Sequence, residues 1–185
     1  MFFFSHSLLA ATGVKAYAEN FLGAGIKFYR LTYNILSLIF LSAILYILLF
    51  RQEMDFVFSP NSITNVGGIC FLFIGILTMV LSFRNYDLGE FTGIKQLAQK
   101  IHHPEKLVVR GLNAYVRNPL YFGIIILIAG FFLIQPTRMN LVSLLIIYAY
   151  IYIGTTLEEK KLEQAFGEEY KSYKKRVRML IPYLF

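Results

Sequence analysis

Two short segments carry most of the residues that could do chemistry. The first reads Arg117-Asn118-Pro119, and the second begins with the adjacent acids Glu158 and Glu159. Proline fits the first turn of a helix, where its missing N–H costs nothing, and asparagine is favoured just before it. Such a helix start presents free N–H groups and a partial positive charge, which suits a carboxylate or another anion. The alternative interpretation is that Arg117 anchors a helix to lipid headgroups and Asn118-Pro119 only opens that helix.

The paired glutamates are harder to explain as anchors. Glu158 and Glu159 stand directly after an apolar run. Carboxylates contribute little to the orientation of a protein across the membrane, and they are costly to bring near hydrocarbon. A functional role and a solvated helix end are equally compatible with this position.

The residues after this pair predict one amphipathic helix. Leu162, Phe166, Tyr170 and Tyr173 recur at spacings of four, four and three, which places them on a single apolar stripe. A helix of this kind can also lie in the membrane interface with its charged face solvated. The basic run 171–178 indicates contact with anionic headgroups rather than with nucleic acid.

The elements that must position these residues are membrane helices. The chain has 185 residues, of which 57% are hydrophobic and only 16% are charged, too few for the surface of a water-soluble domain. Apolar runs occur at about residues 31–50, 66–83, 119–134 and 141–157. We expect four firm transmembrane helices, with residues 1–14 as a possible short fifth. Helices are expected because a backbone in lipid must satisfy its own hydrogen bonds.

The distribution of positive charge predicts the orientation. Lys and Arg number three before the first run, one after it, six after the second, one in the next turn and seven after the last. This alternation follows the positive-inside rule, so loop 84–118 and the C-terminus are expected to be cytoplasmic. The net charge of +7 therefore indicates membrane topology, and no nucleic-acid partner is expected. The short segment 135–140 predicts a tight helical hairpin.

Several classes of protein are disfavoured. The four runs contain no Asp, Glu, Lys, Arg or His, which argues against ion pumps, proton-coupled carriers and voltage sensors. The single cysteine and the three histidines provide neither a disulfide framework nor a credible zinc cluster, so no metal site is expected. His102 and His103 could supply a general base, but a solvated loop is the simpler interpretation.

Glycines recur in the second and third apolar runs. They are Gly67, Gly68, Gly75, Gly123 and Gly130. Small residues let membrane helices approach closely, so these positions predict contacts between helices.

The motifs follow one another in a characteristic order. The chain reads Leu107-Val108-x-x-Gly111, then Arg117-x-Pro119-x-Tyr121-x-Gly123, a hairpin, and Glu158-Glu159-x-x-Leu162-x-x-x-Phe166-Gly167-x-x-Tyr170-x-x-Tyr173. This order resembles the isoprenylcysteine carboxyl methyltransferase and phospholipid methyltransferase superfamily, over about the last 80 residues. Upstream, Arg30-Leu31-x-Tyr33-Asn34 and Phe91-x-Gly93-Ile94-Lys95-Gln96 are more similar to the bacterial branch with methanethiol S-methyltransferases and NnrU-like proteins.

The resemblance implies a small membrane enzyme that uses S-adenosyl-L-methionine. Residues 1–185 would form one membrane-embedded methyltransferase domain, with cofactor-site segments at about 96–123 and 154–178. The cofactor-binding residues it implies are Gln96, Glu105, Lys106, Leu107, Val108, Asn118, Pro119, Leu120, Tyr121 and Glu158. Arg117 is a candidate catalytic residue. The partners would be membrane lipids and a small or lipophilic methyl acceptor such as a thiol, a carboxylate or a lipid headgroup.

The chain also departs from the pattern of the family. Asn118 replaces the usual histidine, Asn113 stands where an aromatic residue is common, and Glu105 stands where histidine is common. Gly154 occupies the position of a substrate-contacting arginine of the eukaryotic enzymes, which argues against a prenylcysteine carboxylate as the acceptor.

The alternative is a non-catalytic membrane subunit or a small-solute permease whose charged residues are only interface anchors. The two hypotheses differ in one structural requirement. An enzyme needs Arg117, Asn118, Pro119 and Glu158 to converge on one site, whereas anchors can face the headgroups independently.

Overall fold

The computed structural model describes residues 55–83 and 107–182, together with Thr32, Ile35, Leu36, Ile39, Ser42 and Tyr46. The chain divides into two compact units, Met1–Gln52 with Tyr86–Pro104, and Glu53–Asn85 with Glu105–Phe185. The six described residues of the first unit are all helical. The possible helix at residues 1–14 and the rest of the predicted span 31–50 lie outside the described residues.

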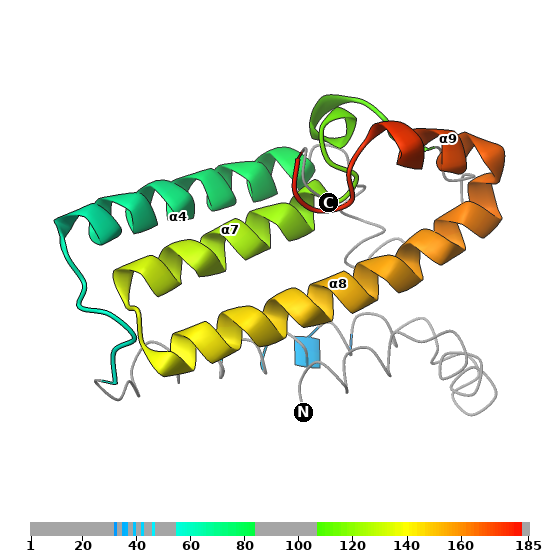
Figure 1. Cartoon of the computed structure of the whole chain (residues 1–185). Helices are drawn as coiled ribbons and strands as arrows, with labels where there is room; N and C mark the ends of the chain where they lie inside the picture. Colours follow the sequence, from blue (N-terminus) through cyan, green and yellow to red (C-terminus); the bar gives the residue numbers. More distant parts are fainter. Residues whose placement is uncertain are drawn as a thin grey trace. The chain divides into compact units, whose positions relative to one another are not determined.

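The described part of the second unit is helical (Figure 1). Its elements are α4 (Ser62–Phe83), the short 3₁₀ helix η2 (Gly111–Ala114), α7 (Pro119–Ile134), α8 (Arg138–Phe166) and α9 (Glu168–Arg176). Within residues 55–83 and 107–182 the extended pairings are two isolated bridges, Phe56 with Thr137 and Val116 with Arg178. The all-helical class is therefore confirmed for this part of the chain.

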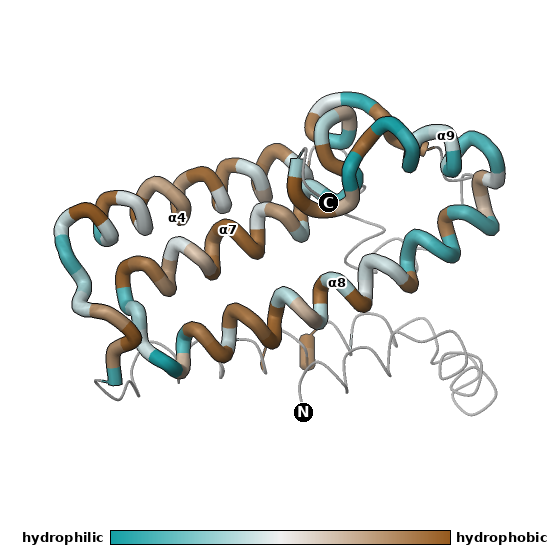
Figure 2. Tube along the Cα trace, viewed as in Figure 1, coloured by the Kyte–Doolittle hydropathy of each residue, from teal (hydrophilic) through white to brown (hydrophobic). Residues whose placement is uncertain are grey.

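Two of these helices, α4 and α8, are long and apolar enough to cross a membrane. Helix α7 has the bounds expected from its apolar run, and with 16 residues it is shorter. Figure 2 shows hydrophobic residues along α4, α7 and most of α8, and hydrophilic residues at the end of α8 and along α9. The 29 residues of α8 correspond to about 43 Å. This length exceeds the thickness of a hydrocarbon core, about 30 Å. Helix α8 thus extends past both ends of the predicted run 141–157.

Helix α4 begins at Ser62, before the apolar run itself, because Asn61 caps it. The Asn61 Oδ1 atom accepts hydrogen bonds from the backbone N–H groups of Ile63 and Thr64, at 2.9 and 3.1 Å. The Thr64 hydroxyl in turn accepts from the Asn61 N–H at 3.0 Å. This reciprocal arrangement is a capping box, which satisfies the exposed donors of the first turn.

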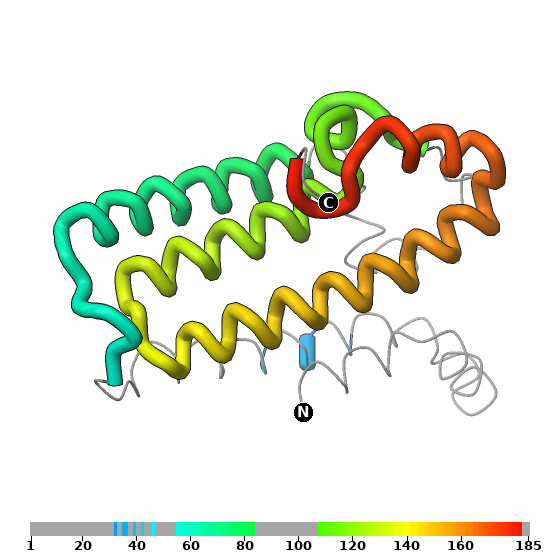
Figure 3. The backbone as a smooth tube through the Cα atoms, in the orientation of Figure 1, coloured from blue at the N-terminus to red at the C-terminus, as the bar shows by residue number. Residues whose placement is uncertain are grey.

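Helices α4 and α7 lie side by side along their length (Figure 3). Two glycine pairs allow this approach. A Cβ atom added to Gly75 would lie 2.8 Å from the carbonyl oxygen of Gly123, and one added to Gly68 would lie 2.7 Å from that of Gly130. The predicted contacts are therefore confirmed for these four residues. The prediction is wrong for Gly67 as far as the described residues go, since an added Cβ atom would have none of their atoms within 4 Å on its side of α4.

The α7–α8 connection is the tight hairpin that its short loop predicts. The Thr137 hydroxyl caps α8 by accepting from the backbone N–H of Asn140 at 3.2 Å. The buried Asn140 amide donates to the Gln135 carbonyl at 2.7 Å. The N–H of Val57, before α4, donates to the Pro136 carbonyl at 2.7 Å. The hairpin is therefore fixed to the segment that precedes α4.

The amphipathic stripe after the glutamates does not lie on one helix. Gly167, with φ +56°, ends α8 and begins α9, so Leu162 and Phe166 belong to α8 while Tyr170 and Tyr173 belong to α9. The prediction of a single helix was wrong because glycine adopts this left-handed conformation without a Cβ clash. The break turns α9 back, and both tyrosines are buried against the rest of the unit.

Candidate active site

The segment before α7 and the segment after α9 run beside each other. The Arg117 N–H donates to the Arg178 carbonyl at 2.8 Å. The backbone N–H and the side-chain amide of Asn118 both donate to the Met179 carbonyl, each at 3.2 Å. These contacts, next to the Val116–Arg178 bridge, place the C-terminal residues directly at the start of α7.

The Arg117 side chain joins three elements. Its Nε donates to Glu159 Oε1 on α8 at 2.6 Å. Its Nη1 donates to the carbonyls of Lys174, at 3.2 Å, and of Val177, at the end of α9. The side chains of Arg117 and Glu159 are only 7% and 3% exposed. The guanidinium, our candidate catalytic group, is therefore held inside the protein by the protein's own acceptors.

Lys174 extends this pair to a cluster of four charges. Its Nζ lies 3.2 Å from Glu159 Oε2 and 2.8 Å from Glu163 Oε1. The hydrogen bond to Glu163 raises the pKa of Lys174, and the same hydrogen bond lowers the pKa of Glu163. The cations Arg117 and Lys174 alternate with the carboxylates of Glu159 and Glu163. Because the cluster holds two charges of each sign, its formal charges cancel.

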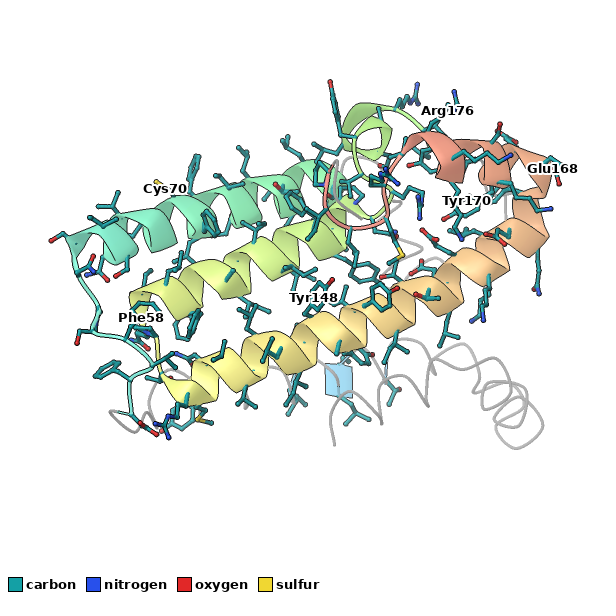
Figure 4. The ribbon with its side chains drawn as sticks, viewed as in Figure 1. Phe58, Cys70, Tyr148, Glu168, Tyr170 and Arg176 are labelled. Carbon is teal, nitrogen blue, oxygen red and sulfur yellow. The ribbon has the colours of Figure 1, made fainter. Side chains whose placement is uncertain are left out.

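Aromatic side chains complete the attachment of α9. Tyr170 and Tyr173 are 2% and 3% exposed and pack edge to face, with ring centroids 5.9 Å apart. The Tyr173 hydroxyl donates to the Asn113 carbonyl at 2.5 Å. Burial raises the pKa of Tyr170 above its usual range. Tyr170 lies between α9 and α8, whereas Arg176 lies on the outer side of α9 (Figure 4). The aromatic side of α9 thus packs on protein.

The two consecutive glutamates have different surroundings. Glu159 is buried in the charge cluster, whereas Glu158 is exposed. The Tyr121 hydroxyl, in the first turn of α7, donates to Glu158 Oε2 at 3.4 Å. Two residues that the family resemblance assigns to the cofactor therefore meet at the protein surface.

The start of α7 lies next to this contact. Asn118 occupies the N-cap position, as expected, and Pro119 is the first helical residue. The Asn118 side chain makes no cap hydrogen bond to α7, and its amide group donates to the Met179 carbonyl. Among the described residues, α7 has no side-chain cap hydrogen bond. Its positive end is thus not neutralised by a capping oxygen of its own N-cap residue.

The remaining predicted site residues divide into two groups. Leu107, Val108 and Leu120 are partly exposed residues of the segments that approach or begin α7. Gln96, Glu105 and Lys106 lie outside the described residues. Sequence reasoning missed Lys174 and Met179, since nothing in a basic tail distinguishes the lysine that pairs with Glu159 from the other lysines.

The described unit is thus a helical body with two membrane-capable helices and a polar, ion-paired site where the start of α7 meets the end of α8. Residues 63–169 match the model of the phospholipid methyltransferase family. The match covers more than half of the chain, and the chain belongs to this family. The resemblance noted in the sequence is therefore confirmed.

Three relatives illustrate the similarity. The chain is 32% identical to a methanethiol S-methyltransferase of Pseudomonas sp. (strain GM41(2012)), over 98% of the chain and 70% of that protein. It is 35% identical to methanethiol S-methyltransferase 1 of Bradyrhizobium diazoefficiens, over 55% of the chain but only 34% of that protein. It is 28% identical to the protein-S-isoprenylcysteine O-methyltransferase of Schizosaccharomyces pombe, over 70% of the chain and 52% of that protein. No solved structure matches the chain.

Proposed function

We propose that this chain is an integral membrane methyltransferase that transfers a methyl group from S-adenosyl-L-methionine to a small or lipophilic acceptor. The observation that carries the proposal is the contact between Tyr121 and Glu158, 3.4 Å long, beside the start of α7. Membership of the phospholipid methyltransferase family supports the reaction class.

The residues at this contact suit the proposed cofactor. S-adenosyl-L-methionine carries a carboxylate, an ammonium group, ribose hydroxyls and an apolar base around an activated methyl group. An exposed carboxylate such as Glu158 can accept hydrogen bonds from the hydroxyl or ammonium groups. The start of α7 offers a positive helix end for the carboxylate through the backbone N–H of Leu120, since Pro119 has no N–H and that of Asn118 donates to the Met179 carbonyl. Tyr121 adds an aromatic surface with a polar tip.

Methyl transfer makes modest demands on a protein. It is an in-line displacement, so the site must hold the acceptor's nucleophilic atom and the methyl carbon in line. The cofactor carries the activated bond, and no protein nucleophile is required. What this chain supplies is a fixed frame, in which the ion pair between Arg117 and Glu159 connects the loop before α7 to α8.

A membrane arrangement gives the two reactants separate routes. We propose that residues 31–50, 66–83, 119–134 and 141–157 span the bilayer, with loop 84–118 and the C-terminus on the cytoplasmic side. The water-soluble cofactor then reaches Glu158 from the cytosol, and a lipophilic acceptor arrives between helices. Relatives named methanethiol S-methyltransferases favour a small thiol as the acceptor. A permease or a non-catalytic subunit would not need the contacts that join residues 117–121 to Glu158 and Glu159.

Calorimetric titration with S-adenosylhomocysteine tests the proposal directly. The purified, detergent-solubilised protein is expected to bind this product of the cofactor saturably. A second assay follows labelled methyl groups from S-adenosyl-L-methionine into a panel of thiols, lipids and prenylated small molecules, with a thiol expected to be methylated. Folded protein that binds no S-adenosylhomocysteine would overturn the proposal.

A further inference from the structure

Glu159 pairs with two cations that come from different parts of the chain. Its Oε1 lies 2.6 Å from Arg117 Nε, in the loop before α7, and its Oε2 lies 3.2 Å from Lys174 Nζ, on α9. A carboxylate that is 3% exposed is costly unless it is paired in this way. The residue therefore connects the loop before α7, α8 and α9 at one point.

Arg117 extends this connection to the end of α9. The carbonyls of Lys174 and Val177 belong to the last turn and C-cap of that helix, where intrahelical donors run out. The Arg117 guanidinium donates to both carbonyls, and its charge is favourable at the negative end of a helix. The chain then continues to Met179, which accepts the hydrogen bonds from Asn118.

The geometry also links the buried contact between Arg117 and Glu159 to the exposed contact between Tyr121 and Glu158. Glu158 and Glu159 are consecutive on α8, so their side chains leave the helix about 100° apart. Tyr121 lies in the first turn of α7, four residues after Arg117. With Glu159 fixed between Arg117 and Lys174, the rotation of α8 is set, and Glu158 is directed to the Tyr121 hydroxyl.

We infer that Arg117 and Glu159 are positioning residues of the methyltransferase site, an inference that rests on the proposed function. They hold the C-terminal segment (residues 168–182) against the start of α7, and through α8 they place Glu158 for the cofactor. Arg117 acts through other residues rather than on substrate, because its side chain is 7% exposed and three protein oxygens accept from it.

Glu163 provides a matched control. It stands one turn after Glu159 on α8 and also pairs with Lys174, at 2.8 Å. Its side chain is 31% exposed, and its hydrogen bond is with Lys174 rather than with Arg117. The substitutions Glu159→Gln and Glu163→Gln therefore remove the same charge from the same helix, but only the first removes the ion pair with Arg117.

The experiment measures S-adenosylhomocysteine affinity by calorimetry and amide hydrogen exchange over residues 168–182. In E159Q we expect the affinity to fall about tenfold or more and exchange in this segment to become faster. In E163Q we expect both to stay within about twofold of wild type at neutral pH. Equal behaviour of the two variants would overturn the inference.

A double variant keeps the test decisive if E159Q does not fold. Replacing a buried ion pair by apolar side chains of similar volume is often neutral for stability, so R117M/E159L is expected to stay folded although the Lys174 and Val177 carbonyls lose a donor. We expect its S-adenosylhomocysteine affinity still to fall about tenfold, because residues 168–182 and Glu158 lose their fixed positions. Full S-adenosylhomocysteine affinity in R117M/E159L would overturn the positioning role alone. A wild-type protein that binds no S-adenosylhomocysteine would instead overturn the proposed function.

Discussion

The Tyr121 hydroxyl donates a hydrogen bond to Glu158 Oε2 across 3.4 Å, joining the first turn of α7 to α8. The contact is long and exposed, in contrast to the buried 2.6 Å bond between Arg117 and the next residue, Glu159. Hydrogen bonds weaken with distance, so a ligand group can replace the Tyr121 hydroxyl as the partner of Glu158 at little cost. The exposed carboxylate is therefore suited to binding, and the buried one to holding the structure.

The first prediction concerns Glu158. Glu158→Ala should weaken the binding of S-adenosylhomocysteine by about 1–3 kcal/mol, because a hydrogen bond to a charged group is lost. Calorimetric titration of the folded, solubilised variant measures this change. Glu169→Ala, which removes an exposed carboxylate of α9, should leave the affinity unchanged. An unaltered affinity in the Glu158 variant would remove this residue from the site.

Hydropathy predicted the positions of the helices in the described unit better than it predicted the residues at which they begin and end. The bounds of α7 agree with its apolar run because Pro119 starts the helix and the short turn stops it. Helix α4 starts earlier, at Ser62, because a polar residue caps it. Helix α8 extends to Phe166, because charged residues end an apolar run without ending a helix. The helix stops only where Gly167 permits a positive φ.

The residues of the site could be found from motifs, but their pairing could not. Glu158 and Glu159 are adjacent and chemically identical, and only the rotation of α8 decides which one is buried. That rotation depends on Arg117, which is 42 positions from Glu159 in the sequence. Likewise, Tyr173 was expected on an apolar stripe, yet its hydroxyl reaches the Asn113 carbonyl 60 positions away. Contacts of this range follow from tertiary packing rather than from local pattern.

The second prediction concerns the protonation of Glu163. Its pKa should lie below the ordinary value of 4.5, because Lys174 donates a hydrogen bond to the charged form. The pair therefore stabilises the folded state above about pH 4.5 and loses this contribution as the pH falls through the lowered pKa. Carboxyl-carbon NMR titration measures the shift of this pKa, which Lys174→Met should reduce because the hydrogen bond from Lys174 is its largest cause. Glu168 is the control, since Lys171 lowers its pKa and the Lys174 variant should leave it unchanged.

The third prediction concerns the attachment of α9. Tyr173→Phe should lower the free energy of unfolding by about 0.5–1.5 kcal/mol, because the hydrogen bond to the Asn113 carbonyl is lost while the ring remains. Tyr115→Phe removes a hydroxyl from a side chain that is 64% exposed, so it should have no effect. Thermal unfolding in detergent compares the two variants with wild type. Equal stability of both would show that the 2.5 Å contact contributes nothing.

The fourth prediction concerns the packing of α4 on α7. Gly75→Ala should lower the free energy of unfolding by about 1–3 kcal/mol, because rigid neighbours must move apart. The new Cβ atom would lie 2.8 Å from the Gly123 carbonyl oxygen and from the Leu127 backbone, neither of which can rotate away. Denaturant titration in micelles, followed by circular dichroism, measures the change.

Gly67→Ala is the matched control for this fourth prediction, since it makes the same change in the same helix where no atom of residues 55–83 or 107–182 lies within 4 Å of the new Cβ. Alanine favours a helix over glycine by about 0.5–1 kcal/mol, so this variant should be as stable as wild type or slightly more so. A Gly75 variant as stable as the Gly67 variant would contradict the prediction, because it would mean that α4 and α7 do not require glycine where Gly75 meets Gly123.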